Sequence, residues 1–486
     1  MAWATHVMAT STDRADVVVI GAGLAGLSAA VRLASAGCTV VVCEEGPRLG
    51  GRASAFTDRE SGERIDNGQH ALFGCYRETY AFLRAIGTDH LAPLQSRLDV
   101  TMAAAGGRSG RLACPRWPPP WHLVGAVLRW PALPVRDRLG AVRLRGFLSD
   151  VRRRGAEAAA SAVPADQTVT DWLVRHGQSP ALRAWLWNPL AIAALNQSPD
   201  TAAAAPFVRV LGELFGPRAE DSAIAVPTVP LDELYAEPAR AFVEARGGRV
   251  LLKTPARVRV GAGGAIAGVA AGGENIETRV VISSVPWHAL GRIWDGEPPR
   301  AMATILERAA ATRSSPIVTV NLWSDGAGLG RPFVGLVGGP MHWVFDKRAV
   351  FGSRARHLSI VASGAEDLVA IDNAAITALA ARQIADTLPD LVPGRIDRSV
   401  VVREHRATFS LAPGAPPRPD PATPISGFWL AGDWTNTGLP GTIESAVVSG
   451  HRAADGALAV NRQSIVNPRS SIFNAGFTIV SSRCHR

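Results

Sequence analysis

Three glycines and one acid near the N-terminus have the spacing of a nucleotide-binding motif. Gly21, Gly23 and Gly26 stand in the order Gly-x-Gly-x-x-Gly, and Glu44 follows a little over twenty residues after the first of them. In such a motif the first glycine permits a tight turn, the second lets the backbone approach a pyrophosphate, and the third lets a helix pack closely on a strand. A carboxylate at Glu44 can accept hydrogen bonds from both ribose hydroxyls, which disfavours a 2′-phosphate. The four residues predict a dinucleotide site.

The segments around these residues predict the elements that position them. Residues 16–20 form a β-branched run typical of a buried strand, residues 27–36 an Ala-rich helix that Gly37 ends, and residues 39–43 a second strand that leads to Glu44. Strand, glycine turn, helix, strand and acid in this order make the motif far more specific than glycines alone. The free N–H groups at the helix N-terminus would face the anion. A glycine-rich turn without a ligand is the alternative.

Two further motifs distinguish between the dinucleotides. Gly51-Arg52 closes a second glycine pair just after Glu44, and Gly432-Asp433 ends a strand near the C-terminus, before a helix that opens near Pro440. With these motifs in this order, the sequence resembles the superfamily of flavin amine oxidases and carotenoid desaturases. The resemblance implies FAD as the cofactor. It assigns cofactor contacts to Gly51, Arg52, Gly432, Asp433, Thr442 and Ile443, and a backbone contact with the adenine to Val258.

Between the termini the resemblance narrows to one family. Segments 66–79, 186–196, 227–248, 403–409 and 432–440 are similar to the squalene-associated FAD-dependent desaturases, a family now understood as hydroxysqualene dehydroxylases of hopanoid biosynthesis. The similarity covers about residues 15–458. It implies an α/β fold with a Rossmann-type FAD domain built from discontinuous segments and an inserted α+β substrate domain, as in amine oxidases. The boundaries expected are 13–75, 232–300 and 396–460 for the FAD domain, 76–231 and 301–395 for the substrate domain, and 461–486 for a disordered tail.

The family resemblance implies a reductive reaction on a C30 allylic alcohol. Hydroxysqualene would lose its hydroxyl, and the reduced flavin would deliver a hydride from N5 to give squalene. Departure of the hydroxyl as water needs an acid, and we expect His70 to supply the proton while Asp66 orients or charges it. Water would attack an allylic cation, so an apolar and aromatic cavity is expected. The other candidate donors are Tyr235, His342, Asp346 and Arg406.

Three other functions stay open. An oxidative desaturase of squalene or a carotenoid precursor would use the same cofactor motifs, and the direction depends on an electron donor that the sequence does not identify. An amine oxidase is disfavoured, because many of these enzymes hold a water near the flavin with a lysine. Of the two lysines, Lys253 falls in a strand-like run and Lys347 is expected to be solvated at the surface. A lipid-binding protein that retains FAD for structure is the third alternative.

Residues 117–154 combine tryptophan, proline, apolar residues and many arginines. Helices of this composition can lie on an anionic membrane, and the other interpretation is a helical cap over the substrate cavity with solvated arginines. The N-terminus is too short and polar for a signal peptide, and no apolar run reaches the roughly 20 residues of a membrane span. We expect a cytoplasmic protein. Peripheral contact with the inner face of the cell membrane and a partnership with upstream squalene-synthase-like enzymes stay open.

The composition excludes several classes of protein. Among 486 residues 47% are apolar and 19% charged, which excludes a wholly disordered chain. The net charge of +9 comes almost entirely from arginine, and without a zinc finger or an RNP strand it does not indicate nucleic acid. The five cysteines form no Cys-x-x-Cys pair, which argues against a disulfide framework and a metal site and fits a reducing cytosol.

Overall fold

A five-stranded parallel sheet forms the centre of one half of the molecule. The computed structural model describes the chain except for residues 1–11, 327, 353–355, 390, 392–394 and 467–486. In spatial order the strands are β10 (Arg249–Leu251), β3 (Val40–Cys43), β2 (Val17–Ile20), β14 (Val281–Ser283) and β20 (Phe428–Leu430). Both β2 and β3 are buried at every position, which accounts for their β-branched runs. Strands from three distant parts of the chain share this sheet, so the expected α/β fold with a discontinuous Rossmann-type half is confirmed.

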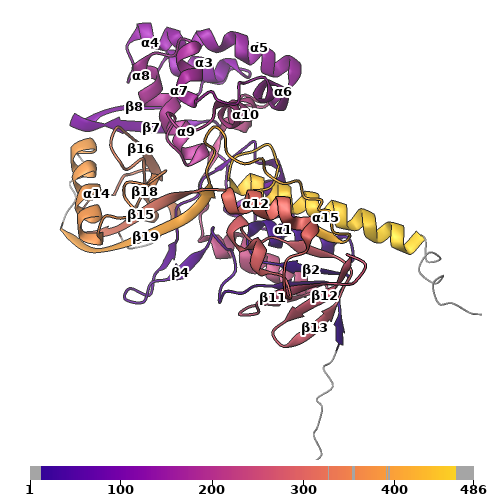
Figure 1. Cartoon of the computed structure of the whole chain (residues 1–486). Helices are drawn as coiled ribbons and strands as arrows, with labels where there is room; N and C mark the ends of the chain where they lie inside the picture. Colours follow the sequence, from indigo (N-terminus) through magenta and orange to yellow (C-terminus); the bar gives the residue numbers. More distant parts are fainter. Residues whose placement is uncertain (1–11, 327, 353–355, 390, 392–394, 467–486) are drawn as a thin grey trace, which may run out of the picture.

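Two helices pack against each other beside this sheet, α1 (Leu24–Ser35) and α15 (Ile443–Val466) (Figure 1). Gly450 permits their close approach, because a Cβ atom there would lie 2.3 Å from the carbonyl oxygen of Ala25. Arg32 donates two hydrogen bonds to the Asp455 carboxylate, at 2.7 and 2.8 Å. Helix α15 continues into the first residues of the expected disordered tail, 461–486, and the rest of that tail lies outside the described residues.

Smaller elements complete this half of the molecule. A four-stranded sheet has the order β1 (Thr12–Arg14), β13 (Glu274–Glu277), β12 (Ile266–Ala271) and β11 (Ala256–Val260). The others are α2 (Arg77–Ala85), α11 (Glu237–Glu244), α12 (Ala303–Ala311) and the strand pairs β4 (Ala55–Thr57) with β5 (Arg64–Asp66) and β6 (Leu72–Phe73) with β9 (Ile224–Ala225).

A seven-stranded sheet forms the centre of the other half. Its order is β19 (Ile396–Phe409), β15 (Ser314–Ser324), β18 (His357–Ser363), β17 (Trp343–Asp346), β16 (Phe333–Val337), β7 (Asp99–Ala104) and β8 (Arg108–Ala113), with α13 (Lys347–Phe351) and α14 (Asn373–Thr387) beside it. The third FAD segment is expected to start at residue 396, the first residue of β19. Strand β19 is antiparallel to β15 along most of its length, so its backbone hydrogen bonds place it in this sheet. The expected boundaries stay predictions.

A cluster of helices caps the seven-stranded sheet near β7 and β8 (Figure 1). It comprises α3 (Trp121–Leu128), α4 (Val135–Gly140), α5 (Arg145–Arg154), α6 (Ala156–Ser161), α7 (Val169–Arg175), α8 (Pro180–Leu182), α9 (Asn188–Leu195) and α10 (Ala204–Leu214). Residues 117–154 thus form several short helices of this cap. Among the helices of the described residues, none has the length and apolar character to span a membrane.

Candidate active site

A cavity of about 890 Å³ lies where the glycine turn after β2 meets the loops before α15. Most of the residues expected to bind the cofactor line it: Gly21, Gly23, Glu44, Gly51, Arg52, Gly432, Asp433, Thr442 and Ile443. Two expected residues, Gly26 and Val258, are absent from its lining. The structure therefore brings together motifs that lie nearly 400 residues apart in the sequence.

Two glycines of the turn at the start of α1, Gly21 and Gly26, leave no room for side chains. Gly21 has a φ of +99°, and a Cβ atom on Gly26 would lie 2.0 Å from the carbonyl oxygen of Gly21. Gly51, with a φ of +59°, approaches Gly23 so closely that a Cβ atom on it would lie 3.1 Å from the Gly23 Cα atom. Gly26 thus serves the packing of the helix on the turn, and the other glycines keep bare backbone at the cavity wall.

The polar groups of this wall fit a dinucleotide. Helix α1 begins at Leu24, and the residue before it, Gly23, provides no side-chain cap, so the first N–H groups of the helix are available to a pyrophosphate. The Glu44 carboxylate accepts hydrogen bonds from the backbone N–H groups of Ala22, at 2.8 Å, and Gly46, at 2.7 Å, which fix it at the cavity. Its remaining lone pairs can accept hydrogen bonds from ribose hydroxyls.

Arg52, from the N-terminal part of the sequence, and Asp433, from the C-terminal part, meet at the wall of the cavity. The Arg52 guanidinium donates to both carboxylate oxygens of Asp433 and, at 3.0 Å, to the carbonyl oxygen of Ala407. The Asp433 side chain is almost fully buried, so the two charges compensate each other at the cavity wall.

Val258, which was expected to contact the adenine through its backbone, does not line the cavity. Its N–H donates to the carbonyl oxygen of Ile293 at 2.7 Å, and its carbonyl oxygen accepts from the N–H of Asp295 at 3.0 Å. Both backbone groups are therefore already used within the protein. Ala256 and Arg257, earlier in the same strand, line the cavity instead.

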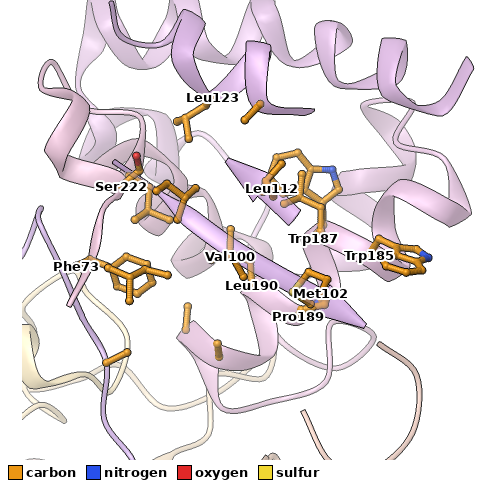
Figure 2. A pocket seen from close by; sticks show the side chains of 18 of the residues that line it. Phe73, Val100, Met102, Leu112, Leu123, Trp185, Trp187, Pro189, Leu190 and Ser222 are labelled. Atoms are coloured by element: carbon orange, nitrogen blue, oxygen red, sulfur yellow. The ribbon is translucent and has the colours of Figure 1, made fainter. Parts of the chain in front are cut away.

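A second cavity, of about 260 Å³, lies between the helical cap and the seven-stranded sheet, and its walls are mainly apolar and aromatic. Figure 2 shows Trp185 and Trp187 from the cap on one side and Val100 and Met102 from β7 crossing beneath them. Trp130, Leu144, Leu148 and Phe333 also line it. These walls exclude water and suit a hydrocarbon ligand.

The two cavities meet at a junction of seven residues that line both. They are Gln69, Ala71, Tyr76, Ala193, Ala194, Val361 and Ser363. A ligand in the apolar cavity can therefore reach a cofactor in the larger one only past these side chains. The polar members of the junction are the groups able to act on a reacting bond there.

His70 lines the cofactor cavity beside this junction. Its Nδ1 atom is buried and has no hydrogen-bond partner among the described residues. Burial lowers the pKa of His70, an effect that the Asp66 carboxylate opposes and Lys347 reinforces. The imidazole is therefore neutral near pH 7 and can donate only through an N–H.

Asp66, the expected partner of His70, does not line either cavity. Its carboxylate accepts hydrogen bonds from the Leu231 N–H and from Lys347 Nζ, both at 3.1 Å. The expectation that Lys347 is solvated is wrong, because only 1% of this residue is exposed. Lys347 also donates to the Gln69 side-chain oxygen.

The other polar candidates divide into structural residues and one residue at the cavity. The Tyr235 hydroxyl donates to the Gly50 carbonyl oxygen at 2.9 Å, and the Asp346 carboxylate accepts backbone N–H groups at the start of α13. His342 Nδ1 accepts from the N–H of Ser363 at 3.1 Å, a junction residue. Arg406 lines the cofactor cavity.

Sequence reasoning missed Gln69 as a site residue. A lysine side chain only donates hydrogen bonds, so the Gln69 oxygen must face Lys347 and the amide NH₂ is left for the junction. The only signal in the sequence was its place directly before His70. The contact with Lys347, 278 residues away, needed the fold.

Comparison with known proteins gives consistent results. The chain matches the flavin containing amine oxidoreductase family over residues 24–458. It is 32% identical to the hydroxysqualene dehydroxylase of Rhodopseudomonas palustris, over 92% of this chain and 99% of that protein. It is 26% identical to a probable zeta-carotene desaturase of Synechococcus elongatus, over 91% and 98%. The solved structure of putrescine oxidase with putrescine has a TM-score of 0.66 at 18% identity, over 92% of this chain and all of that one.

Proposed function

Because the chain belongs to the flavin containing amine oxidoreductases and its cofactor is FAD, we propose that it converts hydroxysqualene to squalene by reductive dehydroxylation. The observation that carries this proposal is the apolar cavity that opens onto the cofactor cavity at the seven-residue junction. A C30 isoprenoid offers the hydrocarbon surface that such walls bind, and its single hydroxyl would need a polar group only near the junction.

The proposed reaction breaks one C–O bond and forms one C–H bond. The hydroxyl leaves as water after it gains a proton, and the electron pair for the new C–H bond comes from outside the substrate. Bound FAD in its reduced form supplies that pair as a hydride and is oxidised in the exchange. The protein residues need only orient the alcohol, assist departure of the hydroxyl and keep other water away.

We assign the departure of the hydroxyl to two neighbouring residues. Gln69 would donate a hydrogen bond from its amide NH₂ to the hydroxyl oxygen, because Lys347 holds the amide oxygen on the other side. His70 would supply the proton in its protonated form, which burial makes a stronger acid, and would be left as the neutral imidazole at the wall of the cofactor cavity. Asp66 and Lys347 would act as positioning residues. Lys347 contacts Gln69, Asp66 contacts Lys347, and the charges of both residues act on His70.

The apolar walls would protect the reacting carbon. An allylic cation is attacked by any water within reach, so a dry cavity favours the intended transfer. Trp185, Trp187 and Trp343 line this cavity and would face the hydrocarbon chain of the substrate. An aromatic face also stabilises a developing positive charge.

An oxidative desaturase of squalene or a carotenoid precursor is the second candidate. The similarity to a probable zeta-carotene desaturase favours it, since the same cavity and cofactor motifs serve either direction. The identity to this relative is lower than to the hydroxysqualene dehydroxylase, 26% against 32%, and we therefore rank it second.

We also propose the setting in which the reaction takes place. A cytoplasmic protein in peripheral contact with the inner face of the cell membrane would meet a substrate that partitions into lipid. The substrate would come from an enzyme of the squalene-synthase type, because a head-to-head prenyl coupling is the class of reaction that yields a C30 allylic alcohol. The electron donor to the flavin stays open.

Product analysis tests the proposed function. The FAD-loaded protein is incubated with hydroxysqualene and a chemical reductant without oxygen, and the lipids are extracted. Squalene is expected in the reduced sample and not with oxidised protein. Unchanged hydroxysqualene, together with conversion of squalene or a carotenoid precursor by oxidised protein, would favour the desaturase.

A further inference from the structure

The exposed apolar side chains of the molecule are concentrated on the helical cap. The large apolar residues that are exposed within the described chain are Trp117, Trp121, Val135, Leu139, Val142 and Val174, and all of them belong to the cap region. We call the first five the cap patch. Trp121 is 58% exposed, Val135 65% and Leu139 56%, which is costly for such side chains in water.

The cap patch has a regular arrangement on its helices. Val135, Leu139 and Val142 are four and three residues apart along a continuous helical run, so they form one outward stripe. The opposite side of the same run carries Ala141 and Leu144, which line the apolar cavity. One short layer of helix thus separates the exposed stripe from the substrate cavity.

The segment that carries the cap patch is rich in arginine. Residues 116–154 contain nine arginines and only two acidic residues, Asp137 and Asp150. Arg136 is 87% exposed and Arg153 73%. The Arg129 guanidinium lies 4.7 Å from the centre of the Trp117 ring, and Arg152 donates to the Pro119 carbonyl oxygen at 2.8 Å, which ties the end of α5 to the loop between the two tryptophans.

We infer that the cap patch docks on an anionic lipid bilayer and that an apolar substrate passes from the bilayer into the cavity between α3 and residues 141–148. Tryptophan and aliphatic side chains insert at the headgroup boundary, and the arginines pair with anionic headgroups. Leu123, Val124 and Val127 of α3 line the cavity on one side of this path, and Leu144 and Leu148 on the other. The docking itself rests on the surface alone, and only the identity of the substrate rests on the proposed function.

Vesicle sedimentation tests the docking without turnover. FAD-loaded protein is mixed with vesicles of phosphatidylglycerol and phosphatidylcholine or of phosphatidylcholine alone. The wild type is expected to pellet with the anionic vesicles. The triple variant Trp121→Gln, Val135→Gln, Leu139→Gln and the triple variant Arg136→Gln, Arg153→Gln, Arg154→Gln should each bind at least about tenfold more weakly. Equal binding by the variants, or no binding by the wild type, would overturn the inference.

A charge-matched control separates the patch from total charge. Arg279, Arg308 and Arg382 are exposed and lie outside the cap, so their triple Arg→Gln variant should bind vesicles like the wild type. Flavin absorbance and the melting temperature show that each variant is folded. Loss of binding in this control equal to that of the cap variant would contradict a local site.

Turnover in two media tests the path. The apolar cap variant should lose conversion of hydroxysqualene held in vesicles and keep conversion of the same alcohol dispersed in detergent, because the substituted side chains face away from the cavity. Equal loss in both media would overturn the proposed path. Vesicle binding by the wild type without conversion in either medium would contradict the proposed function and leave the docking surface intact.

Discussion

Lys347 Nζ donates a hydrogen bond to Asp66 Oδ2 at 3.1 Å, and each of the two side chains is only 2% exposed. The pair joins α13 of one half of the molecule to the end of β5 in the other. Because Lys347 also holds the Gln69 oxygen, this ion pair fixes a side chain at the junction of the two cavities. Burial lowers the pKa of Lys347, and the Asp66 carboxylate opposes that effect.

Removal of one partner of this ion pair should destabilise the protein strongly. Lys347→Met leaves the Asp66 carboxylate buried without its cation, and we expect a loss of about 3–5 kcal/mol in the free energy of unfolding. The double variant Lys347→Met, Asp66→Asn should recover much of that loss, since no buried charge remains. Chemical denaturation of these two variants and of the single variant Asp66→Asn measures the coupling. Additive losses would show that the two residues do not act as a pair.

Gln69 should affect the rate of conversion and not the binding of the cofactor. Gln69→Glu keeps the size of the side chain and an oxygen for Lys347 but removes the NH₂ donor, so we expect conversion to fall by a factor of about ten or more. Gln69→Ala should lose a similar factor. Single-turnover kinetics give the rate, and flavin absorbance gives the bound cofactor. Wild-type rates in Gln69→Glu would exclude the proposed hydrogen bond.

The polar groups of the cofactor cavity should determine how tightly FAD is held. The two carboxylate oxygens of Glu44 accept hydrogen bonds from the N–H groups of Ala22 and Gly46. In Glu44→Gln an amide NH₂, which cannot accept, replaces one of these oxygens, and the remaining oxygen is a weaker acceptor. In Arg52→Gln the buried Asp433 carboxylate loses its cation. We expect each variant to bind FAD about tenfold more weakly, so that FAD dissociates at a smaller dilution or a lower denaturant concentration. The rise of free flavin fluorescence measures this release. Retention like that of the wild type in both would contradict the assigned cavity.

Acid should destabilise the protein partly through His357. Burial, helped by Lys347 and Arg398, lowers the pKa of His357 to about 3, while an exposed histidine in the unfolded chain titrates at 6.5. Its neutral form donates a hydrogen bond from Nε2–H to the Asn321 side-chain oxygen at 2.9 Å. Below pH 6.5 His357 therefore binds a proton in the unfolded chain but not in the folded chain. Its contribution to the free energy of unfolding falls by about 1.4 kcal/mol for each pH unit, down to the pKa of the folded state.

A variant without this titration provides the comparison. His357→Gln can still donate to Asn321 but does not titrate, so its stability should fall less steeply than that of the wild type between pH 6.5 and 4. Urea unfolding at several pH values measures both slopes. Parallel slopes would exclude His357 as the source.

Local patterns in the sequence were enough to predict the cofactor half of the molecule. The Gly21 turn and the buried strands before and after it follow from residue types within a few positions of one another, whereas the role of the Gly432-Asp433 pair came from the family resemblance. Steric limits on glycine and burial of β-branched strands act locally, and a sequence displays them directly.

Pairing over long distances could not be predicted in the same way. Whether β19 continues the parallel sheet or joins β15 depends on hydrogen bonds between strands about 80 residues apart, and no periodicity records the partner. Lys347 was expected in water because lysine is almost never fully buried without a partner, and its partner lies 281 residues away. The Val258 backbone was expected to contact the adenine, whereas its N–H and its carbonyl oxygen form hydrogen bonds with Ile293 and Asp295 within the protein.

Anaerobic reoxidation of the flavin tests the central claim most directly. The FAD-loaded protein is photoreduced without oxygen and mixed with hydroxysqualene in detergent, while absorbance is followed and the lipid is extracted. The proposed reaction predicts that the oxidised-flavin spectrum returns as squalene forms, one molecule for each flavin. The proposed reaction would be contradicted if the flavin stayed reduced in the presence of hydroxysqualene while squalene or a carotenoid precursor bleached the oxidised protein.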